Sequence, residues 1–256
     1  ERHLAAPEEA CAYLDEVGRR WFPAGVPVER HTHTTETSSV ARSIAEHVTE
    51  LGGDLVVMCT HGRGGVRGFL FGSIAQQVVA RSVAPVLLIR PDPAGAGKAF
   101  ACSHILAPLD GTEAHEHGLP VAVELATACG AALHLTVVVP TLGTLPGEHT
   151  ASGILLPSAT RAVLDLAEEQ ATDYLRRRVA EALSRGLAVT GEVRRGDPTA
   201  TLVRAAQDAQ ADLVVLGTHG KAGSEAFWAG STAPKLCRRL HAPLLLVPLA
   251  KGEEQD

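Results

Sequence analysis

The sequence has few aromatic residues and no long apolar run. Aromatic side chains make up 4% of its 256 residues, too few for the stacking platforms that hold single-stranded nucleic acid. The net charge of -6 at pH 7 also disfavours nucleic acid, because phosphate backbones are bound mainly by clustered Lys and Arg. No apolar stretch approaches the roughly 18–20 residues of a membrane helix, and no signal-peptide pattern opens the chain. We therefore expect neither nucleic acid nor a membrane as a partner.

Paired cysteines are also lacking. The five cysteines are an odd number and include no C-x-x-C pair, a spacing typical of zinc and thioredoxin-like sites. Disulfide-rich secreted domains carry paired cysteines, so reduced thiols and a cytoplasmic location are the expectation. The chain starts at Glu1 and its only methionine is Met58, which favours a piece of a longer reading frame.

A long internal repeat divides the chain. Asp212–Pro248 aligns with Asp54–Arg90 at a constant offset of 158 residues, with 17 identities in 37 positions and no gap. A period of this length indicates a duplicated domain rather than a short solenoid repeat. The predicted division is a partial first domain at 1–91, a linker at 92–100, a complete second domain at 101–250 and a tail at 251–256.

In the second repeat, short apolar runs alternate with helical patterns. The expected strands are 104–110, 132–139, 187–194, 213–216 and 243–248. The expected helices are 112–128, 160–185, 198–209 and 232–240. Thr112 should cap the first of these helices, and Pro120 should bend it. Strands that alternate with helices predict an α/β fold with an open, parallel, Rossmann-like sheet.

The first repeat contains only the later part of this pattern. The predicted elements are helices at 7–21 and 39–51, then a third strand at 26–33, a fourth at 55–58 and a fifth at 85–90. The first two strands have no counterpart, and the first is central in sheets of this kind, so an exposed sheet edge or a gap should result. Missing upstream sequence, complementation by another chain and a rearranged domain are three explanations, and the first is favoured.

A glycine-rich loop follows the fourth strand of the second repeat. Gly217-Thr-His-Gly220, nine residues and Gly230-Ser231 lie between an apolar run and a helix that begins at Thr232. Glycine lets the backbone approach a ligand closely, and free amides at a helix start favour phosphate. The loop therefore predicts an anion site.

Two motifs make the chain resemble the universal stress protein family in its tandem, two-domain form. One is the loop pattern G-x2-G-x9-G-[ST] after the fourth strand, and the other is Pro108-Leu-Asp110-Gly111 at the end of the first complete strand. The resemblance covers residues 101–250 fully and 7–91 partly. It implies two adenine-nucleotide α-hydrolase-like domains, the first without its N-terminal strands. It also implies ATP as the ligand, with Mg or Mn as a candidate metal for the phosphates.

The resemblance further implies where ATP would lie in the second domain. The nucleoside is expected near the ends of the first two strands, and the phosphates are expected in the glycine loop. The implied contact residues are Pro108, Asp110, Val138, Leu216, Gly217, Gly220, Gly230, Ser231 and Thr232. Independently of the resemblance, these segments lie at the carboxyl ends of parallel strands, where open α/β sheets bind ligands.

The corresponding loop of the first repeat is not expected to bind nucleotide. Cys59 adds a side chain at the position of Gly217, and Asp110 has no counterpart. Cys59 is interpreted as a small, packed apolar residue. We therefore predict at most one ATP per chain.

Two pairs of histidines suggest metal ligands but are assigned other roles. His115 and His117 are two positions apart on a predicted helix, where side chains diverge, so a solvated face is the better interpretation. His31 and His33 share a face of a predicted strand, but no third ligand is apparent. No metal site and no catalytic residue are predicted.

The leading hypothesis is a stress-response or regulatory protein that binds ATP and hydrolyses it slowly or not at all. A fold-only interaction module without nucleotide, and a carrier of an apolar small molecule, are the alternatives. Residues 85–90 and 243–248 should pair within the chain as a pseudo-dimer, because the resemblance implies such pairing and it hides an aggregation-prone edge. A homodimer is a further arrangement consistent with the resemblance.

Overall fold

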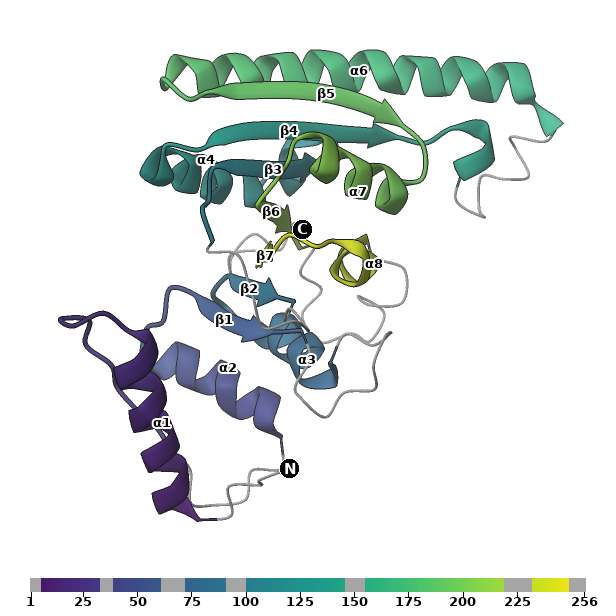
Figure 1. The fold of residues 1–256 in the computed structure, drawn as a ribbon. Coiled ribbons are helices and arrows are strands. Elements are labelled where there is room, and N and C mark those ends of the chain that lie inside the picture. Colours follow the sequence, from purple (N-terminus) through teal and green to yellow (C-terminus); the bar gives the residue numbers. More distant parts are fainter. Residues whose placement is uncertain are drawn as a thin grey trace.

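The computed structural model describes residues 6–32, 39–60, 72–90, 100–145, 155–218 and 232–248. Those residues form a seven-stranded sheet in the order β1-β2-β7-β6-β3-β4-β5, with helices on both faces (Figure 1). Helices α4 and α6 belong to one buried apolar cluster and helices α7 and α8 to the other, on the opposite face. This two-sided burial explains the nearly continuous apolar strands of the sequence.

The second repeat supplies five strands, all parallel to one another. They are β3 (His104–Leu109), β4 (Ala132–Val139), β5 (Val189–Arg195), β6 (Leu213–Gly217) and β7 (Leu244–Val247). Its helices are α4 (Gly118–Cys129), α6 (Pro157–Ser184), α7 (Pro198–Asp208) and α8 (Thr232–Arg239), with short 3-10 turns η1 (Glu113–His115) and η2 (Leu142–Thr144). The predicted parallel α/β fold is confirmed. No described helix is both long and apolar enough to cross a membrane.

The predicted helix at 112–128 is wrong at its beginning. Residues 113–115 form the separate turn η1, and α4 starts only at Gly118. Pro120 therefore lies in the first turn of α4, where its missing amide breaks no helical hydrogen bond and causes no bend. The Thr112 side chain makes no capping bond to this turn and instead donates to Asp110.

The first repeat supplies two strands and three helices. They are α1 (Pro7–Trp21), α2 (Val40–Glu50), β1 (Val56–Cys59), α3 (Ser73–Arg81) and β2 (Val86–Ile89). Among the described residues, β1 is an end strand of the sheet with no strand beyond it, in agreement with the exposed edge expected from the sequence. Leu55 and Val57, on one face of this edge, are 48% and 55% exposed.

The predicted third strand of the first repeat is wrong over its described part. Residues 26–32 form no strand. The counterpart of this segment in the second repeat is β5, which pairs with β4 over seven positions. Within the described residues the first repeat contains nothing equivalent to β4, so an extended segment at 26–32 has no neighbour to accept its hydrogen bonds.

The two repeats meet where β2 pairs antiparallel with β7. Leu88 lies opposite Leu244, and Val86 lies opposite Leu246. Leu88 is 2% exposed and Leu246 is fully buried. The expected intrachain pairing of 85–90 with 243–248 is thus present, and it joins both repeats into one sheet (Figure 1).

Candidate functional site

The predicted nucleotide site lies at the carboxyl ends of β3, β4 and β6. β3 runs between the other two strands, with Leu109 opposite Val137 and Leu106 opposite Val214. This order brings together the strand ends that carry Asp110, Val138 and Gly217. Three further predicted residues are described: Pro108 is buried, while Leu216 and Thr232 are partly buried. Gly220, Gly230 and Ser231 lie outside the described residues.

Asp110 is held in a tight turn directly after β3. Its Oδ1 accepts hydrogen bonds from the Thr112 amide at 2.9 Å and from the Thr112 hydroxyl at 2.8 Å. Gly111 has a φ of +87°, which a side chain at this position would strain. Burial by itself raises the pKa of the Asp110 carboxyl, but the Thr112 hydrogen bonds and the neighbouring His115 outweigh it, so the pKa lies below its usual value. Asp110 is therefore an ionised acceptor at neutral pH.

His115 contacts the other oxygen of the same carboxylate. Its Nδ1 meets Asp110 Oδ2 and lies 3.0 Å from the Thr112 hydroxyl oxygen. That hydroxyl already donates its proton to Asp110, and an ionised carboxylate only accepts. Nδ1 must therefore carry the proton in this arrangement.

His117 connects α4 to the start of the glycine loop. Its Nε2 lies 3.0 Å from the carbonyl oxygen of Thr218, to which it donates because a carbonyl has no proton to give. The contact is close because two glycines face each other beside it. A Cβ on Gly118 would lie 2.7 Å from the Gly217 amide, and a Cβ on Gly217 would lie 2.8 Å from His117 Nε2. A side chain at Gly217 would therefore displace the His117 ring, independently of any ligand.

The interpretation of His115 and His117 as a solvated face is correct for the exposed His115 but wrong for His117, which is partly buried and bonds to the Thr218 carbonyl. It assumed a regular helix from 112, whereas a 3-10 turn precedes α4, so the spacing argument did not apply. Both side chains contact strand ends that carry predicted site residues. The sequence contained a signal for this, since each histidine lies within seven residues of Asp110 and β3 is followed by a glycine turn.

Arg178 of α6 forms ion pairs with the segment 113–116 that precedes α4. Its guanidinium pairs with Glu113 and Glu116, each at 2.7 Å, and with Glu181 at 3.1 Å. Arg178 and Glu116 are each only 18% exposed, so this pair is less weakened by solvent than an ordinary surface pair. These ion pairs fix the segment from which His115 and His117 project.

Cys59 occupies a different environment from its counterpart Gly217. It is exposed, so the interpretation as a packed apolar residue is wrong. The described part of the first repeat has no helix equivalent to α4. No such helix therefore contacts Cys59 in the way that His117 and Gly118 contact Gly217. The same hydrogen bond follows both strands, from Thr60 N to Ile89 O at 2.9 Å and from Thr218 N to Val247 O at 2.8 Å. The backbone repeat is therefore preserved although the glycine is not.

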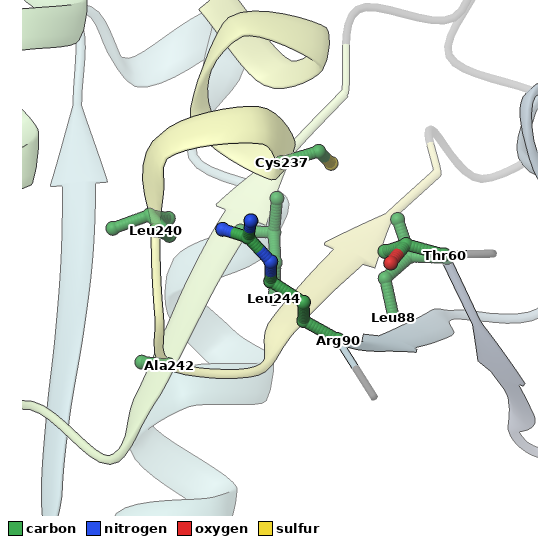
Figure 2. A pocket seen from close by; sticks show the side chains of 7 residues that line it. All are labelled: Thr60, Leu88, Arg90, Cys237, Leu240, Ala242 and Leu244. Carbon is green, nitrogen blue, oxygen red and sulfur yellow. The ribbon is translucent and has the colours of Figure 1, made fainter. Parts of the chain in front are cut away.

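A separate small pocket lies beside the junction of the repeats (Figure 2). Its lining combines residues of both repeats: Thr60, Leu88, Arg90, Cys237, Leu240, Ala242 and Leu244. Arg90 Nη1 donates to the Arg238 carbonyl at 3.5 Å. Burial raises the pKa of the Cys237 thiol to about 12, so this thiol stays protonated at neutral pH. The pocket shares no residue with the predicted nucleotide site.

Metal-ligating side chains do not gather within the described ranges. No group of three or more His, Cys, Asp and Glu side chains there is arranged to hold a metal ion. His33, one of the two strand histidines considered from the sequence, lies outside the described residues, whereas His31 pairs with Glu29 at 3.5 Å.

One known protein family matches both repeats. The universal stress protein family matches residues 3–90 and 102–248. The chain belongs to this family. A universal stress protein of Methanocaldococcus jannaschii is 30% identical over 153 residues, which cover 58% of this chain and 84% of that relative.

Solved structures share the tandem universal stress protein fold. A functionally unknown protein of Pseudomonas aeruginosa PAO1 is 17% identical with a TM-score of 0.67, covering 97% of this chain and 80% of its own. A universal stress protein of Archaeoglobus fulgidus is 18% identical with a TM-score of 0.58, covering 82% of this chain and 66% of its own. These likenesses extend over both repeats and show the fold.

Proposed function

We propose that this universal stress protein binds ATP in its second repeat and acts as a stress-response or regulatory protein. The observation that carries the proposal is that Asp110 and Gly217 lie at the carboxyl ends of the neighbouring strands β3 and β6. An ionised acceptor there suits the hydroxyl or amino donors of a nucleoside. The strand that ends at Gly217 leads into the glycine loop, and Thr232 opens the helix beyond it. A helix start with free amides favours phosphate.

The described side chains do not fit a metal bound by the protein itself. Mg²⁺ and Mn²⁺ prefer carboxylate and carbonyl oxygens, yet both oxygens of Asp110 are engaged by Thr112 and His115. Any such metal would accompany the phosphates. We propose no catalytic base, and slow hydrolysis or none, within one ATP site per chain. We also propose a cytoplasmic location.

Isothermal titration with ATP tests this function. The wild-type chain should bind ATP, and Asp110→Ala should weaken binding by about tenfold or more, because a hydrogen bond to a charged group contributes roughly 1.5–3 kcal/mol. Asp173→Ala is the matched control, since Asp173 is an exposed carboxylate that pairs with Arg176 on α6. Absence of ATP binding would favour the interaction module without nucleotide, whereas equal binding by Asp110→Ala would show that ATP does not contact this carboxylate.

A further inference from the structure

The Asp110 carboxylate is already crowded by donors of its own turn. It receives the Thr112 amide and hydroxyl on Oδ1 and the His115 ring on Oδ2. A carboxylate offers about four acceptor positions, so at least three of them are filled. The carboxylate and the imidazole side chains are each 39% exposed. Solvent, and thus a ligand, can reach both side chains.

A nucleoside with two adjacent donors needs two acceptor positions on Asp110. At least one present donor must then leave or share its oxygen. The Thr112 amide belongs to the backbone of the turn at Gly111 and cannot leave without unwinding it. The Thr112 hydroxyl is bound to the oxygen that the amide fixes. His115 is the donor that can swing outward, because its side chain is partly exposed and bonds to the second oxygen.

We propose that His115 is an intramolecular latch on the nucleoside side of the ATP site, occupying Asp110 Oδ2 until the nucleotide displaces it. The inference rests on the proposed function, because it requires that ATP binds to Asp110, the residue that His115 contacts in the absence of ligand. His117 has a different part, since it donates to the Thr218 carbonyl and keeps the helix start against β6. His115 thus acts at Asp110 on the nucleoside side of the site, whereas His117 acts at the start of the glycine loop.

Removing the latch should strengthen ATP binding. The wild type must break the His115 contact before ATP binds, so His115→Ala should lower the Kd by about threefold to fivefold, the range for a partly exposed contact to a carboxylate. The affinity for inorganic tripolyphosphate, which has no nucleoside, should not change. His115→Gln, which keeps a donor near Asp110, should lie between wild type and His115→Ala.

The experiment is a titration of the full chain and three variants with ATP and, separately, with tripolyphosphate. His47→Ala is the matched control, because His47 pairs with Glu50 on α2 in the first repeat. A ligand-free readout accompanies it: the Asp110 carboxyl carbon is followed by NMR as the pH is lowered. His115 is one of the groups that lower the pKa of Asp110, so His115→Ala should raise that pKa toward its usual value.

The outcomes separate the latch from the ATP site. If the wild type binds ATP and His115→Ala binds it equally or more weakly, His115 is not a latch, and the ATP function stands. If His115→Ala binds ATP and the wild type does not, the latch is supported in its strongest form. If neither binds ATP, both proposals are overturned, and the NMR titration then shows whether the His115 contact exists without that role.

Discussion

At the scale of single residues, the most informative one is Gly217. The family motif suggests that glycine is needed there so that a ligand can approach. The structure supplies a second reason, because the backbone of β6 touches His117 and Gly118 at the start of α4. Loss of ligand binding by a Gly217 variant would therefore not by itself locate the ligand.

Gly217→Ala should destabilise the protein in the absence of nucleotide. Its Cβ would lie 2.8 Å from His117 Nε2, and forcing such a contact costs about 1–3 kcal/mol. Urea unfolding measures the change in the free energy of unfolding. The control is Cys59→Gly at the equivalent position of the first repeat, where the side chain is exposed and the change should stay under about 1 kcal/mol. Equal stability of Gly217→Ala and wild type would contradict the packing argument.

The Asp110 turn should lose stability in acid. The pKa of Asp110 is lowered in the folded protein, so its contribution is present above the usual carboxyl pKa and disappears as the pH falls through the lowered value. Asp110→Asn lacks this titration. Unfolding in urea at pH 6 and at pH 3 should therefore show a larger loss for the wild type than for Asp110→Asn. A smaller loss for the wild type would mean that the turn does not hold an ionised carboxylate.

At the scale of elements, local signals predicted most of the fold. Pro7 and Pro198 each open a helix, and Asp197 caps α7 by accepting from the Ala200 amide at 2.8 Å. Such signals are contained in a few neighbouring residues. The failures depended on partners distant in the sequence. The strand at 26–33 needed a neighbour, and the roles of His115 and His117 needed the end of β6 beside them, which no local pattern reveals.

The β2–β7 pairing should be essential to the sheet. Leu88→Asp or Leu246→Asp would place a charge where the native side chains are 2% and 0% exposed, at a cost of about 3 kcal/mol or more. Val57→Asp on the exposed face of β1 is the control, at 55% exposure, and should change stability by roughly 0.5 kcal/mol or less. Circular dichroism during urea unfolding gives both values. A tolerated Leu246→Asp would argue against the observed junction.

At the scale of the whole molecule, the two repeats are unequal parts of one sheet. Among the described residues, the second repeat contributes five strands and the first contributes two. The described part of the first repeat has no counterpart of the Asp110 turn or of α4.

Calorimetric titration should accordingly give one ATP per chain. Within the described residues, the second repeat combines an ionised acceptor with a glycine at the strand end, whereas the first repeat has Cys59 at the position of that glycine. Asp110→Ala should weaken all of the ATP binding by about tenfold or more rather than half of it. Two equivalent sites per chain would overturn the assignment of ATP to the second repeat alone.

Because β2 and β7 are antiparallel, the strands of the two repeats have their carboxyl ends at opposite ends of the sheet. We call these two ends the rims of the sheet. β1 and β2 run parallel to each other, and β2 runs against β7 and its four parallel neighbours. Asp110 and Gly217 thus project from one rim, while Cys59 projects from the other. A fluorophore attached to the exposed Cys59 thiol, with the other exposed cysteines Cys11 and Cys129 replaced, would report on the rim opposite the proposed ATP site. If ATP binds at the first rim as proposed, a partner protein bound at the rim of Cys59 would not contact it, and any coupling between the two would have to pass through the strands of the sheet.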